Sequence, residues 1–277
     1  MELSVVGFGG ICVKDETPED AARIVATARD RGISYFDVAP QYGNAEERLG
    51  PALEPYRKDI FLACKTLMRE GAEARKDFQT SLSRLRTDHI DLYQLHGIET
   101  DEDVDRLLGP GGTIELLEEL KRSGAVRFAG FSAHNEDAAL RLLKAYPFDS
   151  ILFPINRFTW HQGNIGPRIA AKAQERGTAI LALKALALRR RRENEEKKWS
   201  KTWYKPVESA EEAALGLRFT LSRPVTAAVS PGHEELLWWA CDAADDFVPL
   251  SAEEEAKLAR EAHEMPPLFS REITSIH

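Results

Sequence analysis

Cysteine is scarce in this chain of 277 residues, which has only Cys12, Cys64 and Cys241. The three are far apart and odd in number, so they suit neither a disulfide framework nor a zinc site. We therefore expect free thiols and a reducing compartment. The seven histidines show no spacing typical of a metal site either, and we expect no metal ligands.

The chain also lacks an excess of basic charge and any long apolar run. Its net charge of −8 argues against a nucleic-acid-binding protein, and its 43% hydrophobic residues argue against disorder. No apolar run approaches the roughly 20 residues of a membrane span. The first ten residues have no basic segment ahead of their apolar stretch, so we expect no secretory signal. These features predict a cytoplasmic globular protein that acts on a small molecule, with no nucleic-acid or membrane partner and with its oligomeric state left open.

Short apolar runs alternate with amphipathic helical stretches, which is the pattern of repeated βα units. The junctions at Asp30, Arg122 and Glu175 each pass from a helix through a glycine into a strand. Eight such units predict one domain, residues 1–277, folded as a (β/α)8 TIM barrel of the α/β class, with a doubly wound parallel sheet as the rival. The predicted strands are 3–8, 33–38, 60–65, 90–95, 126–131, 151–155, 179–183 and 226–229.

Capping residues mark the ends of several predicted helices. Thr17 precedes Pro18 at the start of the first helix, and Gly32 ends it. Ser251 and Glu254 form a capping box ahead of an extra C-terminal helix, residues 251–262. Other helices are predicted at 72–85, 114–120, 138–145, 169–174 and 210–221, and residues 189–208 are expected to form a long charged loop.

Catalytic groups of such barrels gather where the strands end. Each polar residue there also has a structural interpretation: an Asp and a Lys can form a buried ion pair, a His can be a hydrogen-bonded structural residue, and a Tyr-Gly can be a turn. The residues at these ends are Asp37, Lys65, His96, Ser132, His134, Asn156, Lys184 and Ser230, with Tyr42 in the loop after the second strand.

Four of these residues form a chemically coherent set. An ammonium at Lys65 would lower the pKa of Tyr42 from about 10, so that the phenol could exchange a proton near neutral pH. Asp37 would hold that ammonium in place. A neutral His96 could donate a hydrogen bond to a carbonyl oxygen. The set predicts a site that polarises a carbonyl and protonates it.

These residues lie in a long motif. Residues 36–50 read FDVAPQYGNAEERLG, which resembles the signature of the aldo-keto reductases, and residues 91–96, DLYQLH, resemble the strand-four motif of that family. The resemblance implies a (β/α)8 barrel and nicotinamide-dependent reduction of an aldehyde or ketone. It also implies a catalytic tetrad of Asp37, Tyr42, Lys65 and His96, with Tyr42 as general acid.

The same resemblance implies a cofactor site and a small carbonyl or alcohol substrate. Ser132 and Asn156 would hold the carboxamide of the nicotinamide, and Glu235 would lie near the adenine. The implied cofactor-binding residues are Gly10, Ile11, Asp37, Ser132, Asn156, Lys184, Ala185, Leu186, Ser230, Gly232 and Glu235.

The sequence departs from the family pattern in several places. The N-terminal β-hairpin that usually plugs the barrel is missing, and Ala133 stands where many members have Asn. Glu234 and Glu235 stand where members that prefer NADP usually have Lys or Arg, and their charges would repel a phosphate. Arg223 or the run 189–192 could offset this repulsion. Because the resemblance is to a family in which NADP(H) is usual, NADP(H) is the favoured cofactor and NAD(H) is the alternative.

Two other functions stay open at this point. The missing hairpin and altered cofactor contacts also suit a cofactor-binding regulatory protein with the same fold and little turnover. A hydrolase or isomerase could use Asp37 and His96 without a cofactor. In the charged loop, the aromatic residues 199, 203 and 204 would either cover the bound molecules or pack on the barrel.

Overall fold

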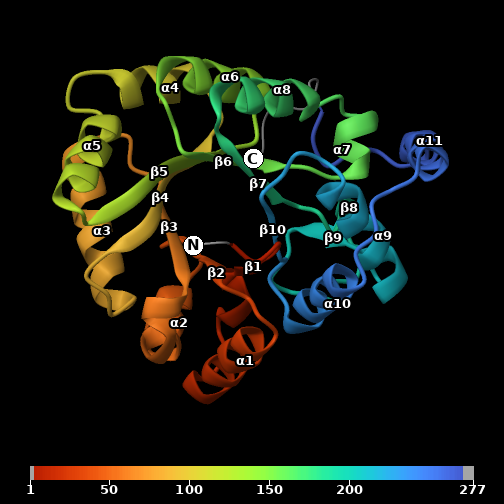
Figure 1. The fold of residues 1–277 in the computed structure, drawn as a ribbon, viewed down its shortest axis with the longest axis horizontal. Coiled ribbons are helices and arrows are strands. Elements are labelled where there is room, and N and C mark those ends of the chain that lie inside the picture. The colour runs from red at the N-terminus through yellow and green to blue at the C-terminus, as the bar shows by residue number, and fades with distance from the viewer. Residues whose placement is uncertain (1–2, 271–277) are drawn as a thin grey trace.

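The computed structural model describes residues 3–270, in which eight parallel strands close into a barrel. Around the barrel the order is β1, β10, β7, β6, β5, β4, β3, β2 (Figure 1). This closure confirms the barrel and excludes the doubly wound sheet. The strands are β1 (Val6–Gly9), β2 (Tyr35–Asp37), β3 (Phe61–Thr66), β4 (Ile90–Ile98), β5 (Val126–Ala133), β6 (Ser150–Pro154), β7 (Ala179–Leu183) and β10 (Ala227–Val229).

Helices surround the barrel as an outer ring (Figure 1). They cover the apolar outer face of the strands, which explains why these strands are short runs buried on both faces. The helices are α1 (Pro18–Asp30), α2 (Ala45–Leu53), α3 (Gly71–Arg84), α4 (Asp101–Leu108), α5 (Thr113–Ser123), α6 (Glu136–Ala145), α7 (Arg157–His161), α8 (Pro167–Arg176), α9 (Ala210–Leu221), α10 (Glu234–Asp245) and α11 (Ala252–Glu261), with short 3-10 turns η1 (Gly10–Val13), η2 (Glu54–Asp59) and η3 (Ala262–Glu264).

The predicted caps form as expected. The Thr17 hydroxyl accepts a hydrogen bond from the Asp20 amide, and Gly32 adopts φ = +81° just after α1. Ser251 and Glu254 form a complete capping box at the start of α11, the predicted C-terminal helix. These local interactions fix where the first and last helices begin.

Residues 189–208 are not the simple loop that the sequence predicts. β8 (Ala187–Arg190) pairs antiparallel with β9 (Tyr204–Pro206), which makes a small sheet beside the barrel. The Arg189 guanidinium binds both carboxylate oxygens of Glu195 at 2.8 Å, so the charges of this segment are paired within it. The hairpin therefore has a defined fold that brings residues 201–204 to the carboxyl ends of the barrel strands.

Inside the barrel, the side chains alternate between the interior and the helices. Tyr35, Phe61, Leu92, Leu152 and Leu181 form one compact cluster together with small residues of β3 and β10. On β2 and β3, the next inward positions along each strand carry Asp37 and Lys65. The apolar cluster thus lies directly below the polar residues.

Candidate active site

A cavity of about 210 Å³ lies at the carboxyl ends of the strands. Asp37, Tyr42 and His96 line it on one side, and residues 230–232, after β10, line it on another. Thr202, Trp203 and Tyr204 of the β8–β9 hairpin also contribute to its wall. The position agrees with the rule that barrel enzymes place their sites at this face.

Asp37 and Lys65 form a buried ion pair next to the cavity. The Lys65 ammonium contacts Asp37 Oδ1 and donates to the Val38 carbonyl at 3.1 Å, and its side chain is fully buried. Burial opposes the charge of this lysine, but Asp37 outweighs it, so the pKa of Lys65 is raised above its usual value. The lysine is therefore a fixed positive charge.

Two residues that the sequence analysis did not single out hold the other oxygen of this carboxylate. The Tyr35 hydroxyl and the Gln94 amide each donate to Asp37 Oδ2 at 3.0 Å. Tyr35 precedes Asp37 by two positions and Gln94 precedes His96 by two. The period-two alternation of strands puts each pair on the same face, and that signal could have found them.

Tyr42 lies above this pair. The Lys65 ammonium is 5.4 Å from the centroid of the Tyr42 ring. Burial raises the pKa of Tyr42, and although Lys65 opposes this effect, the pKa remains above its usual value. The expected lowering towards neutral pH is therefore wrong for the protein alone, because the desolvation of the phenol outweighs the nearby ammonium.

His96 faces Tyr42 edge-on, with ring centroids 6.1 Å apart. Burial, with Lys65 nearby, lowers the pKa of His96 well below its usual range, so that the ring is neutral at pH 7. Its Nδ1 lies 3.0 Å from the Gln41 amide oxygen. The hydrogen-bond partner of Nδ1 decides which of the two ring nitrogens carries the proton.

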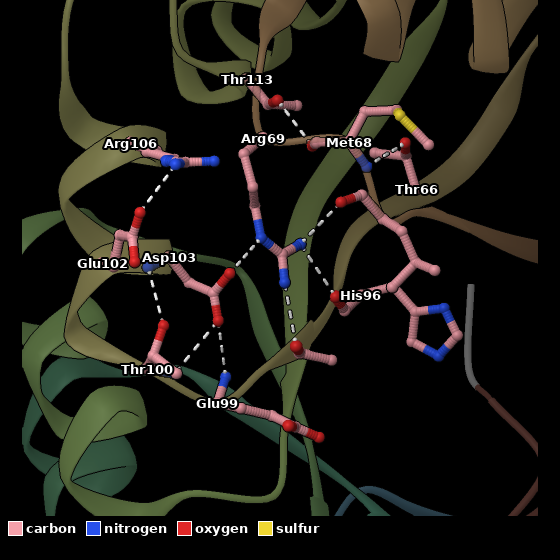
Figure 2. A network of polar contacts seen from close by, with 12 residues as sticks. Thr66, Met68, Arg69, His96, Glu99, Thr100, Glu102, Asp103, Arg106 and Thr113 are labelled. Atoms are coloured by element: carbon pink, nitrogen blue, oxygen red, sulfur yellow. Dashed lines mark hydrogen bonds and ion pairs between the residues drawn. The ribbon is translucent and has the colours of Figure 1, made fainter. Parts of the chain in front are cut away.

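Arg69 fixes the backbone that carries His96 (Figure 2). Its guanidinium donates to the carbonyls of Leu67, His96 and Gly97 at 2.9–3.1 Å and to the Asp103 carboxylate at 2.8 Å. Gly97 has φ = +63°, and the register of β4 shifts between residues 95 and 98. The arginine therefore ties the irregular end of β4 to β3 and α4.

The residues predicted to bind a cofactor divide into two groups. Ile11, Asp37, Ser132, Lys184, Ser230 and Gly232 line the cavity, whereas Gly10, Asn156, Ala185, Leu186 and Glu235 are not part of its lining. Three of the side chains already have partners in the protein: the hydroxyls of Ser132 and Ser230 accept from the amides of Gly97 and Gly9, and Asn156 Oδ1 accepts from the Thr159 amide.

Two features of this region fit a nicotinamide cofactor. The Asn156 Nδ2 is buried and has no hydrogen-bond partner among residues 3–270, so its donor is unused, although Asn156 does not itself line the cavity. A Cβ at Gly232 would come within 2.7 Å of the Ile11 side chain, so the glycine keeps the backbone next to the cavity uncovered.

The charges near β10 are arranged differently from what the sequence suggests. Arg23 binds both oxygens of the Glu234 carboxylate at 2.7 and 2.9 Å, and Glu235 accepts from the Trp199 indole at 3.3 Å. Arg223 is paired with Glu255 of α11 rather than with the loop after β10, residues 230–235. Two lysines of the hairpin are closer to that loop: Lys198 is 3.8 Å from Glu235, and Lys201 lines the cavity.

The aromatic residues of the hairpin have separate roles. Trp199 is buried against Trp239 on the outside of the barrel, with ring centroids 6.1 Å apart. Trp203 and Tyr204 line the cavity instead. The packing interpretation is thus correct for Trp199, whereas Trp203 and Tyr204 lie where they would cover a bound molecule.

Comparison with known proteins assigns the family. The family model "Aldo/keto reductase family" matches residues 5–237, and the chain belongs to that family. The oxidoreductase YqkF of Bacillus subtilis is 34% identical over 172 residues, which are 57% of this chain and 54% of the relative. L-galactose dehydrogenase of Arabidopsis thaliana is 32% identical over 162 residues, 53% of this chain and 50% of the relative. The matches thus span about half the length of these curated relatives.

Solved structures extend the likeness over the whole barrel. The holo form of an aldo-keto reductase from Bacillus halodurans superposes with a TM-score of 0.76 at 25% identity, covering 98% of this chain and 95% of the other. The prediction of an aldo-keto reductase barrel is therefore confirmed. Within residues 3–270, no helix is long and apolar enough to cross a membrane, and no cluster of three or more His, Cys, Asp or Glu could hold a metal ion.

Proposed function

We propose that this chain reduces an aldehyde or ketone to an alcohol with NAD(P)H, using Tyr42 as general acid. The observation that carries the proposal is the grouping of Tyr42, the Lys65–Asp37 pair and a neutral His96 at one end of a single cavity. Such a grouping supplies an acid, a fixed positive charge and a hydrogen-bonding group to one carbonyl oxygen.

Each residue of this group has a separate role in the proposed reduction. His96 orients the carbonyl oxygen, and the Tyr42 Oη gives that oxygen its proton. A nicotinamide cofactor, when bound, would supply the hydride that the carbonyl carbon accepts. Lys65, kept charged by Asp37, stabilises the phenolate that Tyr42 leaves behind, and solvent returns the proton. The raised pKa of Tyr42 keeps the phenol protonated at neutral pH, which suits an acid acting in the direction of reduction.

The cofactor-binding residues proposed from the family resemblance remain a proposal, supported by the orphan Asn156 amide and the open backbone at Gly232. The nicotinamide would lie against Ser132 and Asn156, and the adenosine end against the loop at 230–235. The full proposed set is Gly10, Ile11, Asp37, Ser132, Asn156, Lys184, Ala185, Leu186, Ser230, Gly232 and Glu235.

NADP(H) is the cofactor we favour, with NAD(H) as the alternative. The partners of Glu234 and Glu235 reduce the repulsion that these carboxylates would exert on a 2′-phosphate. Lys198 supplies positive charge near the loop that the sequence pattern lacks. The three cysteines are free and buried, which supports the cytoplasmic location that we propose for this domain of residues 1–277.

The test is Tyr42→Phe, with Tyr56→Phe as the matched control outside the cavity. We expect Tyr42→Phe to lower kcat by at least about 10²-fold, because general acid catalysis contributes that much. NADPH and NADH titrations, followed by tryptophan fluorescence, should give the same Kd in wild type and variant, with NADPH the tighter ligand. Normal turnover by Tyr42→Phe would remove Tyr42 from the mechanism. Tight cofactor binding without turnover of any carbonyl would favour a regulatory protein.

A further inference from the structure

The positive charge of Lys184 is not paired with an acidic side chain among residues 3–270. This lysine follows β7 directly and lines the cavity. Its Nζ lies 4.4 Å from the centroid of the Tyr204 ring and 5.3 Å from that of Trp203, and no carboxylate within residues 3–270 pairs with it. Burial alone lowers the pKa of Lys184 to about 8, so most of the ammonium is still charged at pH 7.

The other lysines at the cavity are neutralised. Lys65 is paired with Asp37, and Lys201 binds Glu16 at 2.6 Å and the Cys12 carbonyl at 2.7 Å. Two aromatic rings attract the Lys184 ammonium, but they do not replace an anion. The cavity therefore contains one cation that could bind an anionic ligand without breaking an existing ion pair.

The backbone at Lys184 supports a functional role. Its φ of +68° lies in the left-handed region, where glycine is the favoured residue. A residue other than glycine keeps a left-handed backbone conformation only where the surrounding structure stabilises it. Such residues cluster at functional sites. Here the aromatic wall of the β8–β9 hairpin is the structure that holds the side chain.

The ammonium acts on the side of the cavity where the carbonyl would bind. Its charge contributes to the low pKa of both His96 and His134, and both rings line the cavity. The apolar side chains of Leu152 and Leu183 form part of the same wall. A short carbon chain could therefore lie against these leucines, with its carbonyl at His96 and its charged end at Lys184.

We propose that the Lys184 ammonium binds an anionic group of the substrate, while the Lys184 backbone stays in the proposed cofactor-binding set, so that the preferred substrates are short aldehydes or ketones with a carboxylate at the far end. This inference rests on the proposed function, because it assigns the substrate class of the same site. The group that would bind Lys184 is an anionic oxygen, and the phosphates of the cofactor also carry anionic oxygens. The experiment must distinguish these two sources.

The probe pair is 4-oxobutanoate and its methyl ester, which share the aldehyde and the carbon chain and differ in the charge and one methyl group. A charge-assisted hydrogen bond is worth about tenfold or more in affinity, so we expect kcat/KM to favour the acid by at least about tenfold in wild type. In Lys184→Met this ratio should fall to near one, and in Lys184→Arg it should be largely kept. Lys144→Met, an exposed lysine on α6, is the control and should keep the full ratio.

Two results would overturn the inference. The first is an equal kcat/KM for acid and ester in wild type. The second is a Lys184→Met variant that binds NADPH more weakly and loses both substrates alike, since the ammonium would then serve the cofactor.

Failure of the proposed function is recognisable separately. If wild type turns over neither probe, calorimetric titration of the NADP⁺-loaded protein with 4-hydroxybutanoate and with 1-butanol decides the matter. Selective binding of the acid that disappears in Lys184→Met supports the anion site although the activity proposal has failed. Absence of such binding overturns both.

Discussion

At the scale of single residues, the chemistry depends on which nitrogen of His96 carries the proton. Gln41 Oε1 is the Nδ1 partner in the structure, and an oxygen accepts, so this orientation puts the proton on Nδ1; rotating the amide by half a turn would place its NH2 donor there instead. Only when the amide donates is Nε2 protonated and able to donate to a carbonyl oxygen. Gln41 is thus a positioning residue, although the family motif surrounding it gives this position no role.

Gln41→Glu tests this relation. A carboxylate at this position can only accept, so it favours protonation of Nδ1, and its negative charge raises the pKa of His96. We expect an imidazole resonance of His96 in NMR to titrate at higher pH in Gln41→Glu than in wild type, and kcat to fall most at low pH, where the ring becomes charged. Gln41→Leu, which lacks an acceptor, is the control and should leave the titration low. An unchanged titration in Gln41→Glu would mean that the contact does not persist in solution.

The residue identities at the strand ends could be predicted from the sequence, but their energetics could not. Asp37, Tyr42, Lys65 and His96 were found because a strand ends at or near each of them. The expected direction of the Tyr42 pKa shift was wrong, because the desolvation that raises this pKa depends on the folded cavity, and part of the cavity wall comes from a hairpin more than 150 positions away.

At the scale of elements, the end of β4 depends on a single side chain from another segment. Arg69 satisfies three carbonyls and one carboxylate, and its side chain is 13% exposed. Without Arg69, these four groups would lose this hydrogen-bond donor in a region that is largely buried. The loop that carries His96 would then be free to shift.

We expect Arg69→Met to lower the free energy of unfolding by about 2–3 kcal/mol, since it removes the charged donor of Asp103 Oδ1 and of three carbonyls. Urea denaturation measures this change. Arg106→Met is the control: it lies on α4 nearby (Figure 2), but its pair with Glu102 is exposed, and its loss should change stability by less than about 0.5 kcal/mol. Equal effects of the two variants would contradict the role assigned to Arg69.

The pH dependence of this difference has a definite sign. Burial opposes the charge of Asp103, but the hydrogen bonds from Arg69 and the backbone outweigh it and lower its pKa. A carboxylate with a lowered pKa in the folded state stabilises the fold above its unfolded pKa of about 3.9, and this stabilisation is lost as pH falls through the folded pKa. The gap between wild type and Arg69→Met should therefore be full at pH 7 and narrow below about pH 4.

The barrel strands could be predicted from the sequence and the β8–β9 hairpin could not, and the reason is physical. The eight barrel strands were found because parallel strands buried on both faces form continuous apolar runs. The β8–β9 hairpin was missed because its segment is charged and its pairing joins Arg190 to Tyr204, across a loop with no apolar alternation. A two-stranded sheet stabilised by its contacts with the barrel leaves little trace in its own sequence.

At the scale of the whole molecule, the three cysteines report on the integrity of the barrel. Cys12 lies in η1 beside the cavity, Cys64 lies in β3, and Cys241 lies in α10, and all three are buried. Burial raises the pKa of all three thiols, to about 12 for Cys12 and about 11 for Cys241. Because the thiolate is the reactive form, all three should be inert in the folded protein.

We expect a thiol-specific disulfide reagent at pH 8 to modify the native protein slowly and the urea-unfolded protein at once, with three equivalents consumed. Cys241, whose pKa is raised least among the three, should be the first to react in the native state, and Cys64, fully buried behind the Lys65–Asp37 pair, the last. Mass spectrometry of the modified peptides gives this order.

Because Cys64 Sγ contacts the Glu46 carboxylate between β3 and α2, its reaction requires that a helix separate from the barrel. Rapid modification of Cys64 in the native protein would therefore mean that the barrel opens on the timescale of the reaction, and that the Lys65–Asp37 pair is not held rigidly enough to keep a proton donor in place.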